Sequence, residues 1–589
     1  RTFGRTLATT HTAPHFPASM KAGLDALPDD VLLALIKACG RHTPDAGGMP
    51  DLQEVHGLAS LCWSVQEQLC RLRPEVMVHS LEAAQRLAPA PDAAADERML
   101  RCGADEAWPV EDESVWRVVL SYAGEPTPQL MEQAKRGRVR LLDARCTALT
   151  EEVARRVVPD LMGESSSLCV LGLSSVHLNA SWVSSFGAAK VCSEVLLELH
   201  MDGCGLQGPI PELELAALRI LYASDNELMG GLEPLRGCTS LEEIGLDGNH
   251  LTGILAPLKG LKTTLRVLNL TDNLMTGGLE ALEGFTGLQG LDLAGNQFSG
   301  GLEGLAGCTA LQGLGLGGNL LTGTLEPLRG CAHCLQGLSL FDNQLHGGLD
   351  ALEDCRLLQS FDGRCNEFVG DVEPLRGCTD LQELRLGTNY LTGTLEPLRE
   401  CTALHGLGLA GNRISGSLEP LRNCTALLGL DLRGNELVGT LEPLRSCRSL
   451  QGLGLACNRI SGDLDPISGC TELQGVDMRC NQLTGGLDAL ESCSEMQVLF
   501  LSGNQLAGSL GPLECMAMLR ELGLGDNQLK GGLEPLEGCT ELQVLCMADN
   551  QLSGSLAPLE SCTALRDLSL ANNNLTGSLE PLEGCTVLH

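Results

Sequence analysis

The chain has 589 residues and a formal net charge of −35. This excess of acid opposes binding to a phosphate backbone, which needs clustered Lys and Arg to displace counterions, so we expect no nucleic-acid partner. No run of apolar residues approaches the roughly 18 that a membrane-spanning helix needs, so we expect no membrane span.

The N-terminal part predicts a tail followed by a small helical domain. Residues 1–20 contain two Arg, several Thr and no acidic residue, which favours a disordered tail over a targeting segment. Within residues 21–85, the stretch LDALPDDVLLALIKAC places two Asp before apolar residues at helical spacing, as at a helix start. The stretch LQEVHGLASLCWSVQEQL then shows a second apolar face.

These two stretches together resemble an F-box, although a longer insertion separates them. The resemblance implies that residues 21–85 dock on the small adaptor of a cullin-type ubiquitin ligase, and an unrelated helical cap is the alternative. The residues that match are Leu27, Pro28, Val31, Leu32, Leu35 and Ile36 in the first stretch, and Leu52, Val55, Leu58, Cys62 and Trp63 in the second.

The middle of the chain predicts a connection and then a change of architecture. Residues 86–115 are rich in Ala, Pro and acidic residues and predict a linker. Residues 116–205 contain VRLLDARCTALT and LCVLGLSSVHL, which predict irregular N-terminal repeats or a cap.

Residues 206–589 contain a regular repeat. The pattern Leu-x-Leu-x-x-Asn occurs in sixteen copies, from Asn226 to Asn573, at intervals of 23 or 24 residues. A fixed period of this length predicts a solenoid, because one unit cannot bury its apolar side alone. The stretch HGLGLAGN at 405–412 also fits the G-x-G-x-x-G pattern of a dinucleotide loop, but the residues from Asn412 to Gly416 predict a loop where a nucleotide site needs a helix.

The frame LxxLxLxxNxLxG resembles the leucine-rich repeat family, and its continuation resembles the plant-type subclass. The resemblance implies an α/β solenoid, that is, a leucine-rich repeat array with short parallel strands on the concave face, preceded by the small helical domain. The last residues, Cys585 to His589, lie inside a repeat. We therefore expect an apolar edge there that is exposed, covered by a partner or continued in a longer protein.

Three columns of the repeat have a structural interpretation. The Asn column is expected to hydrogen-bond backbone groups of its own and adjacent coils, because those groups would otherwise be buried and unpaired. The position four residues after the Asn is Gly in every copy, which predicts a turn with positive φ. The position twelve residues after the Asn is Cys in thirteen copies and apolar in the others, which predicts a buried row of reduced thiols and a cytoplasmic protein.

Partner-binding residues are expected on the outward positions of the predicted strands, two, four and six residues before the Asn. Arg and aromatic side chains anchor many interfaces. An Asp two residues before three of these Arg predicts mutual neutralisation within the strand. The candidates are Tyr222, Phe341, Arg364, Arg385, Arg433, Arg479 and Phe500.

The sequence predicts a non-enzymatic protein-binding scaffold, and the F-box resemblance suggests the substrate receptor of a cullin-type ligase. Catalytic signatures such as G-x-S-x-G and H-E-x-x-H are missing from the sequence, so we expect no catalytic residue, cofactor or metal. One alternative is an extracellular receptor-like ectodomain, suggested by the plant-type repeat and by N-x-S/T sequons that include Asn269, Asn423 and Asn574. A minor alternative is an ice-binding protein, suggested by a row of Ser and Thr three residues after the Asn.

Overall fold

The computed structural model describes residues 170–174, 195–213 and 215–588, together with the backbone of three earlier strands. These strands are β1 (Glu97–Cys102), β2 (Val115–Leu120) and β3 (Val139–Asp143). The chain divides into two units, 1–94 and 95–589, and every described residue belongs to the second. The predicted tail, the helical domain and its adaptor-binding residues therefore lie outside the described residues.

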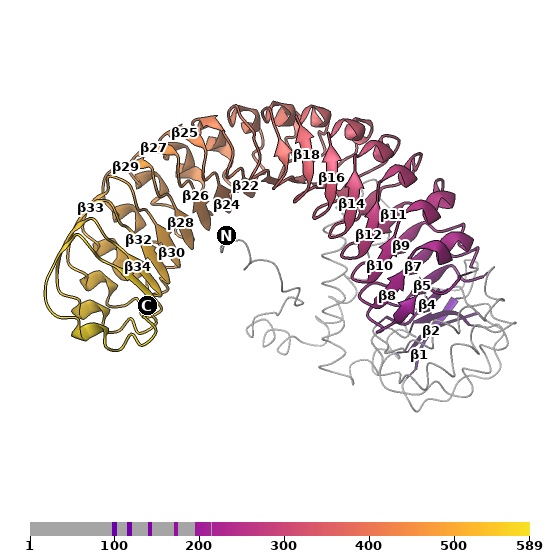
Figure 1. Cartoon of the computed structure of the whole chain (residues 1–589), viewed down its shortest axis with the longest axis horizontal. Helices are drawn as coiled ribbons and strands as arrows, with labels where there is room; N and C mark the ends of the chain where they lie inside the picture. The colour runs from indigo at the N-terminus through magenta and orange to yellow at the C-terminus, as the bar shows by residue number, and fades with distance from the viewer. Residues whose placement is uncertain are drawn as a thin grey trace, which may run out of the picture. The chain divides into compact units, whose positions relative to one another are not determined.

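A parallel sheet of 21 strands runs through the second unit, with one strand for each coil of the solenoid. Its strands lie side by side along the inner side of an arc (Figure 1). The sheet includes β1, so it begins inside the range 86–115 that the sequence predicts as a linker. After β1–β3 its strands are β4 (Val170–Gly172), β5 (Glu198–His200), β7 (Ile220–Tyr222), β9 (Glu243–Gly245), β11 (Val267–Asn269), β13 (Gly290–Asp292), β15 (Gly313–Gly315), β17 (Gly337–Ser339), β19 (Ser360–Asp362), β21 (Glu383–Arg385), β22 (Gly406–Gly408), β24 (Gly429–Asp431), β26 (Gly452–Gly454), β28 (Gly475–Asp477), β30 (Val498–Phe500), β32 (Glu521–Gly523), β34 (Val544–Cys546) and β36 (Asp567–Ser569).

The alternation of side chains in these strands matches the predicted pattern. In β22, Leu407 is 2% exposed and points into the core, while Gly406 and Gly408 on either side face outward. The next inward residue, Leu409, is fully buried. Because side chains of a strand alternate between two faces, every coil contributes the same inward leucines, and these form one continuous core.

The Asn of each repeat joins its own coil to the coil before it, as predicted. The Asn412 side-chain amide donates to the carbonyl oxygens of Leu409 (3.0 Å) and Leu386 (2.9 Å). Its side-chain oxygen accepts from the backbone N–H of Leu391 (2.9 Å). Asn412 is 8% exposed, so these bonds satisfy backbone groups that water does not reach.

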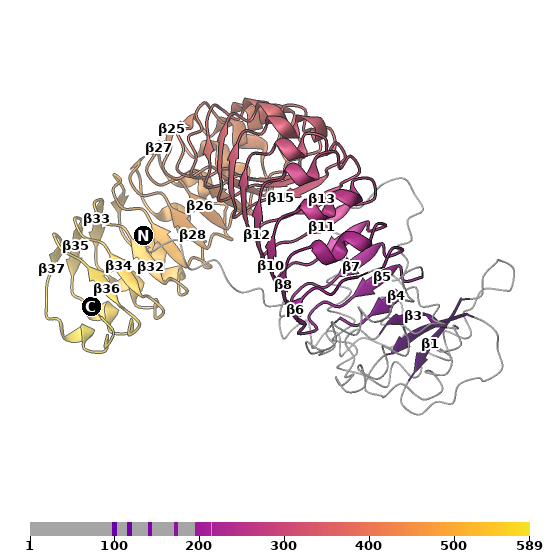
Figure 2. The same cartoon turned by 45° about the vertical axis from the view of Figure 1, so that its right-hand side comes forward.

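The segment after the Asn forms a short parallel strand in fifteen of the sixteen repeats, where the sequence predicts a loop, and these strands make a second row. The segment after Asn389 makes only an isolated bridge, from Thr394 to Ser415. In β23, the N–H of Ser415 donates to the carbonyl oxygen of Gly393 in the preceding coil (2.8 Å). The glycine that follows has a positive φ, as predicted, and it does so in all sixteen copies, with +85° at Gly416. The strands stack along one flank of the arc (Figure 2). They are β6 (Gln207–Pro209), β8 (Glu227–Gly230), β10 (His250–Gly253), β12 (Leu274–Gly277), β14 (Gln297–Gly300), β16 (Leu320–Gly323), β18 (Gln344–Gly347), β20 (Glu367–Phe368), β23 (Ser415–Gly416), β25 (Glu436–Gly439), β27 (Arg459–Gly462), β29 (Gln482–Leu483), β31 (Ala507–Gly508), β33 (Gln528–Gly531), β35 (Gln551–Gly554) and β37 (Asn574–Leu575).

The outer side of the described coils carries short 3₁₀ helices. In η10 (Glu419–Asn423), Pro420 stands near the start, where a missing N–H costs nothing, and Leu421 is buried. A 23-residue coil leaves only about one such turn on this side. The other 3₁₀ helices are η2 (Glu233–Gly237), η3 (Ala256–Leu261), η4 (Glu280–Leu282), η5 (Glu303–Leu305), η6 (Glu326–Cys331), η7 (Asp350–Leu352), η8 (Glu373–Gly377), η9 (Glu396–Leu398), η11 (Glu442–Ser446), η12 (Asp465–Ile467), η13 (Asp488–Leu490), η14 (Gly511–Cys515), η15 (Glu534–Leu536), η16 (Ala557–Leu559) and η17 (Glu580–Leu582).

The thirteen cysteines of the repeat column are buried free thiols, which confirms the predicted row. In the central coils each thiol donates to the backbone of the preceding Cys, for example from Cys424 to the Cys401 carbonyl oxygen (3.5 Å) and from Cys447 to that of Cys424 (3.4 Å). Burial raises the pKa of Cys424 to about 11, and burial and the neighbouring thiols raise that of Cys447 to about 12. Since the thiolate is the reactive form, these thiols are inert in the folded array.

In the part of the chain that the structure describes, no helix has the length and apolar character needed to span a bilayer.

Candidate partner-binding face

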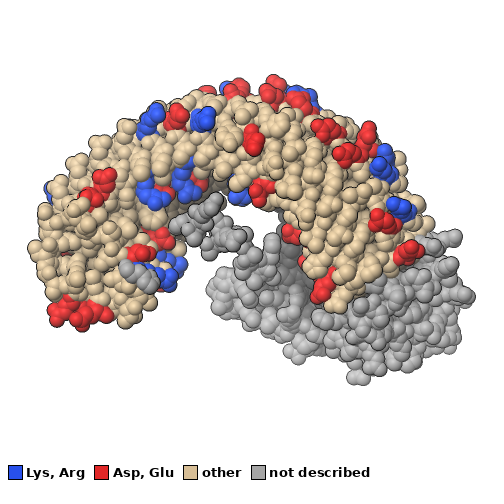
Figure 3. Space-filling model, in the orientation of Figure 1, with Lys and Arg blue, Asp and Glu red and all other residues tan. Residues whose placement is uncertain are grey.

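The outward side chains of the inner sheet form continuous rows across the coils. The pairing of β24, β26, β28 and β30 sets Asp431, Gly454, Asp477 and Phe500 opposite one another in successive strands. Because the register is constant, residues at equivalent positions in neighbouring coils lie side by side. Basic and acidic side chains accordingly lie next to one another along the inner side of the arc (Figure 3).

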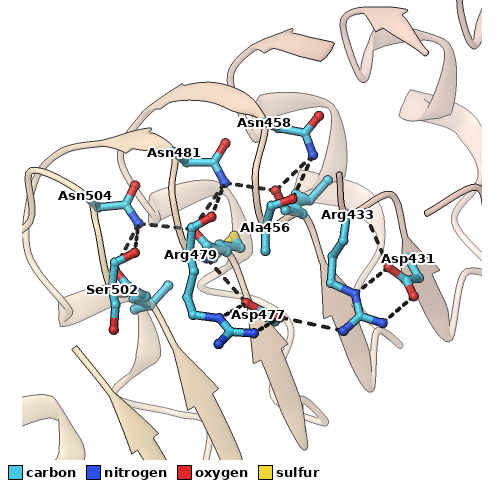
Figure 4. Close-up of polar contacts among 12 residues, drawn as sticks. Asp431, Arg433, Ala456, Asn458, Asp477, Arg479, Asn481, Ser502 and Asn504 are labelled. Atoms are coloured by element: carbon cyan, nitrogen blue, oxygen red, sulfur yellow. Dashed lines mark hydrogen bonds and ion pairs between the residues drawn. The ribbon is translucent and has the colours of Figure 1, made fainter. Parts of the chain in front are cut away.

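Five predicted or neighbouring residues make one cluster on this face, which we call the arginine cluster: Asp431, Arg433, Asp477, Arg479 and Phe500. Arg433 binds both carboxylate oxygens of Asp431 (2.8 and 2.6 Å), and Arg479 binds both of Asp477 (2.9 Å each). Arg433 also reaches Asp477, at 3.7 Å (Figure 4). The Arg479 guanidinium carbon lies 4.7 Å from the centre of the Phe500 ring, a cation–π contact.

The carboxylate of Asp477 lies beneath the two guanidinium groups. Its side chain is 12% exposed, whereas those of Arg433 and Arg479 are 49% and 46% exposed. Hydrogen bonding to the carboxylates raises the pKa of both Arg, so both stay charged. The predicted neutralisation within the strand is confirmed, and it leaves two oriented guanidinium groups facing solvent.

A glycine makes room for the cross-coil contact of Arg433. A Cβ atom at Gly454 would lie 2.9 Å from an Asp431 carboxylate oxygen and 3.2 Å from Nε of Arg433. A side chain at position 454 would therefore displace Arg433 from its path toward Asp477. Gly454 is therefore part of the site, because the side chains of Asp431 and Arg433 lie across it.

A second group of candidates lies several coils earlier. Arg364 binds both oxygens of Asp362 (2.9 and 2.6 Å), and its guanidinium carbon is 5.9 Å from the centre of the Phe341 ring. The Phe341 ring lies across Gly317, where a Cβ atom would come within 2.3 Å of it.

Arg385, in the strand that follows Arg364, pairs with Glu383 at 3.1 Å. Sequence reasoning missed Glu383 as this partner. The spacing of two residues that predicted the other pairs is the signal that identifies it.

Tyr222 lies apart from both groups, near the N-terminal end of the described coils. Its hydroxyl donates to Glu243 (2.5 Å), and its ring centre is 5.3 Å from that of His200. Burial, and then the bond to Glu243, raise the Tyr222 pKa well above its usual value. The hydroxyl is therefore held within the protein, and Tyr222 is not brought together with the arginine cluster.

A polar chain beside Tyr222 was not identified from the sequence. The carboxylate of Asp247 accepts from the hydroxyl of Ser224 (2.6 Å) and from the amide of Asn269 (2.9 Å). Burial raises the pKa of Asp247. The run of polar residues at outward positions of the first regular coils is the signal that could have revealed this chain.

The outer surface carries exposed ion pairs within the 3₁₀ helices. The Glu419 carboxylate binds Arg422 (2.7 and 2.8 Å), and that of Glu442 binds Arg445 in the same way. Screening by water makes such pairs weak, so they add solubility more than stability.

The Ser and Thr row of the second strands is bonded within the array. Hydroxyls of Thr392 and Ser415 donate to the carbonyl oxygens of Gly370 and Gly393 in the preceding coils, at 3.0 Å each. These bonds use the hydroxyl protons inside the protein and leave less donor capacity for the ice-binding alternative.

Comparison with known proteins identifies the class to which this architecture belongs. The family model described as leucine-rich repeats (2 copies) matches residues 540–584, and no curated protein matches the chain. The leucine-rich repeat ectodomain of the membrane receptor kinase GASSHO1/SCHENGEN3 from Arabidopsis thaliana, in complex with CASPARIAN STRIP INTEGRITY FACTOR 2, is similar at 27% identity and a TM-score of 0.68. That match covers 81% of this chain and 60% of the ectodomain.

Two further solved structures share the fold. The Arabidopsis receptor kinase HAESA, in complex with the peptide hormone IDA and the co-receptor SERK1, matches at 25% identity and a TM-score of 0.61, over 76% of each chain. The plant peptide hormone receptor RGFR1, in complex with RGF2, matches at 22% identity and a TM-score of 0.60, over 82% of this chain and 93% of that chain. The chain is thus a leucine-rich repeat solenoid, the fold of a protein-interaction scaffold.

Proposed function

We propose that this protein is a non-enzymatic scaffold that binds an extended segment of a protein partner along its concave face, with the arginine cluster as the anchor. The observation that supports this most is the pair of half-exposed guanidinium groups fixed over Asp477. Fixed Arg donors lose little conformational entropy on binding, and Arg is enriched among the residues that dominate binding energy.

The surroundings of the arginine cluster suit an extended chain. Successive strands present only hydrogen at Gly429 and Gly452, and no atom lies within 4 Å of where a Cβ atom would stand, so the face next to the cluster is open there to close approach by another backbone. The guanidinium groups and the Phe500 ring fit a segment that carries a carboxylate beside an apolar side chain.

The likeness to receptor ectodomains supports a peptide as the bound species. The GASSHO1/SCHENGEN3 ectodomain is in complex with CASPARIAN STRIP INTEGRITY FACTOR 2, and HAESA is in complex with the peptide hormone IDA and the co-receptor SERK1. We propose the same mode of use, a peptide along a leucine-rich repeat array, for this chain.

A pair of matched double variants tests this function. Arg433→Ala with Arg479→Ala removes the anchor, while Arg422→Ala with Arg445→Ala removes the same charge from the outer surface. Affinity purification of the full chain from its native cell, followed by mass spectrometry, should lose a protein partner only with the first pair. Equal recovery of every partner with both pairs would refute the assignment of the concave face.

We also propose, from the resemblance of residues 21–85 to an F-box, that the scaffold acts as the substrate receptor of a cullin-type ubiquitin ligase. The adaptor would bind the first predicted helix, which contains Leu32 and Leu35. The full chain should co-purify with the cullin adaptor, and Leu32→Asp with Leu35→Asp should abolish this. Failure to recover the adaptor with the wild type at micromolar concentration would rule out the ligase role and leave the scaffold.

For the compartment, the row of free thiols supports a cytoplasmic protein, and the likeness to plant ectodomains supports the extracellular alternative. Two sequon asparagines, Asn423 and Asn574, are exposed and accessible to a glycan. The cytoplasmic proposal expects no glycan mass on the native protein. Glycans at these two residues, detected by mass spectrometry after glycosidase treatment, would establish the extracellular alternative.

A further inference from the structure

Two exposed thiols occupy the same place in consecutive coils. Cys457 and Cys480 immediately precede the repeat asparagines Asn458 and Asn481, and both are exposed free cysteines. The strands β26 and β28 that lead into them pair in register. These thiols differ from the thirteen of the buried column, because solvent reaches them.

The stacking of coils brings this position close to its counterpart one coil away. At the next coil, a Cβ atom on Gly503 would lie 3.5 Å from the Cα atom and 3.5 Å from Sγ of Cys480. A Cβ atom on Gly318 would likewise lie 3.6 Å from the Cα atom of Gly295, and a Cβ atom on Gly434 would lie 3.7 Å from the Cα atom of Gly411. The spacing is a property of the coil, so it also applies between Cys480 and Cys457.

The backbone holds the two cysteines in matching orientations. Both are in the left-handed region, with φ of +55° at Cys457 and +54° at Cys480. Their N–H groups donate to carbonyl oxygens of the next coil, those of Arg479 (2.7 Å) and Ser502 (2.9 Å). Disulfides join Cα atoms about 4.4–6.8 Å apart, and neighbouring strands lie about 4.8 Å apart, so the Cα separation falls within the range of a disulfide.

The two sulfur atoms also interact with each other. Partial burial raises the pKa of the Cys480 thiol, and the charge of Cys457 and a hydrogen bond with it raise that pKa further, while Arg479 lowers it. The pair is thus a contiguous dithiol at the rim of the arginine cluster.

We propose that Cys457 and Cys480 form a redox-active dithiol that closes reversibly into a disulfide between consecutive coils when it meets a low-molecular-weight disulfide such as oxidised glutathione. One cysteine thiolate attacks a sulfur of the small disulfide, whose S–S bond breaks and releases one small thiolate. The second cysteine thiolate then attacks the protein sulfur of the mixed disulfide and releases the other. The protein loses two protons and two electrons, and the small disulfide becomes two thiols.

Closure would fasten the coil that carries Arg479 to the coil before it. The disulfide would lie next to the guanidinium groups proposed to hold the partner. A change in the redox state of the dithiol would therefore alter the edge of the proposed partner-binding site. The dithiol does not depend on the proposed function, since its chemistry requires only the two thiols and the small disulfide.

The chain contains its own control for this reaction. Cys365 is exposed at the equivalent position of an earlier coil, where the neighbouring coils carry Asp342 and Thr388 instead of Cys. With oxidised glutathione, Cys365 can form a mixed disulfide but has no second thiol at the equivalent position to displace the glutathione.

The test is to incubate the native full chain with oxidised glutathione, block remaining thiols with iodoacetamide, and map the peptides by mass spectrometry. We expect a Cys457–Cys480 link that dithiothreitol reverses, and a glutathione adduct at Cys365. In the Cys457→Ser variant, the reaction at Cys480 should stop at the adduct. A wild-type Cys480 that keeps its glutathione as Cys365 does would overturn the proposal, and so would an unreacted Cys480.

Discussion

The hydrogen bonds of the repeat asparagines join consecutive coils, and we call them the Asn ladder. Replacing Asn412 by Ala would remove one set of these bonds. The side chain makes three hydrogen bonds, to the carbonyl oxygens of Leu386 and Leu409 and from the N–H of Leu391, all between 2.9 and 3.0 Å. The Asn412 side chain is 8% exposed, so water does not replace the lost partners.

The expected cost follows from these bonds. Each contributes a net of about 0.5–1.5 kcal/mol, and leaving the buried N–H of Leu391 without a partner adds a desolvation penalty. We expect the variant to lose about 3–5 kcal/mol in the free energy of unfolding of the coils around position 412. Asn573 makes equivalent bonds in the last coil but is half-buried, so Asn573→Ala should cost less.

Urea denaturation followed by circular dichroism measures these differences. The control is Asn423→Ala, which alters an exposed side chain of η10 and should change the free energy by less than about 0.5 kcal/mol. If Asn412→Ala and Asn423→Ala unfold at the same urea concentration, the hydrogen bonds of Asn412 do not stabilise the array.

The remaining predictions concern the turn glycines and the thiol column. Gly416→Ala places a Cβ atom on a backbone with φ of +85° and 3.2 Å from Cγ2 of Thr394, so it should destabilise by about 1–2 kcal/mol or more. Gly429→Ala meets no atom within 4 Å in an extended strand and should be neutral or stabilising in the same urea assay; the reverse ranking would contradict the turn argument. Burial raises the pKa of Cys424 to about 11 and of Cys447 to about 12, from 9.0. The stability that these protonated thiols provide is therefore complete below pH 9 and is lost as the pH rises toward 11 to 12. Cys424→Ala with Cys447→Ala should flatten the fall of unfolding free energy with pH above 9, and an unchanged slope would show that these thiols do not titrate on unfolding.

Features that depend on a residue's place within its own coil could be predicted from the sequence. The inward leucines, the Asn ladder, the thiol column and the positive φ of Gly416 all repeat with the period, and each has one physical interpretation. The second row of strands could not be predicted in this way. A pair as short as β23 and β25 forms because stacking brings two backbones together, and its own residues resemble those of a turn.

In the candidate site too, contacts within one coil could be predicted from the sequence, whereas contacts between coils could not. The pairing of Asp431 with Arg433 follows from a spacing of two residues within a strand. The reach of Arg433 to Asp477 spans two coils and depends on the missing side chain at Gly454. The stacking of Arg479 on Phe500 likewise depends on which residue the next coil supplies. Cross-coil contacts therefore require the three-dimensional register, which single-coil patterns do not contain.

The contacts between secondary-structure elements join consecutive coils, which has a mechanical consequence. Tension applied to one end would load the terminal coil alone, so the array should unzip stepwise instead of rupturing at once. Each step would release one 23-residue unit, which extends to roughly 80 Å of polypeptide. A single-molecule stretching trace should therefore show evenly spaced force peaks, one for each coil that unfolds.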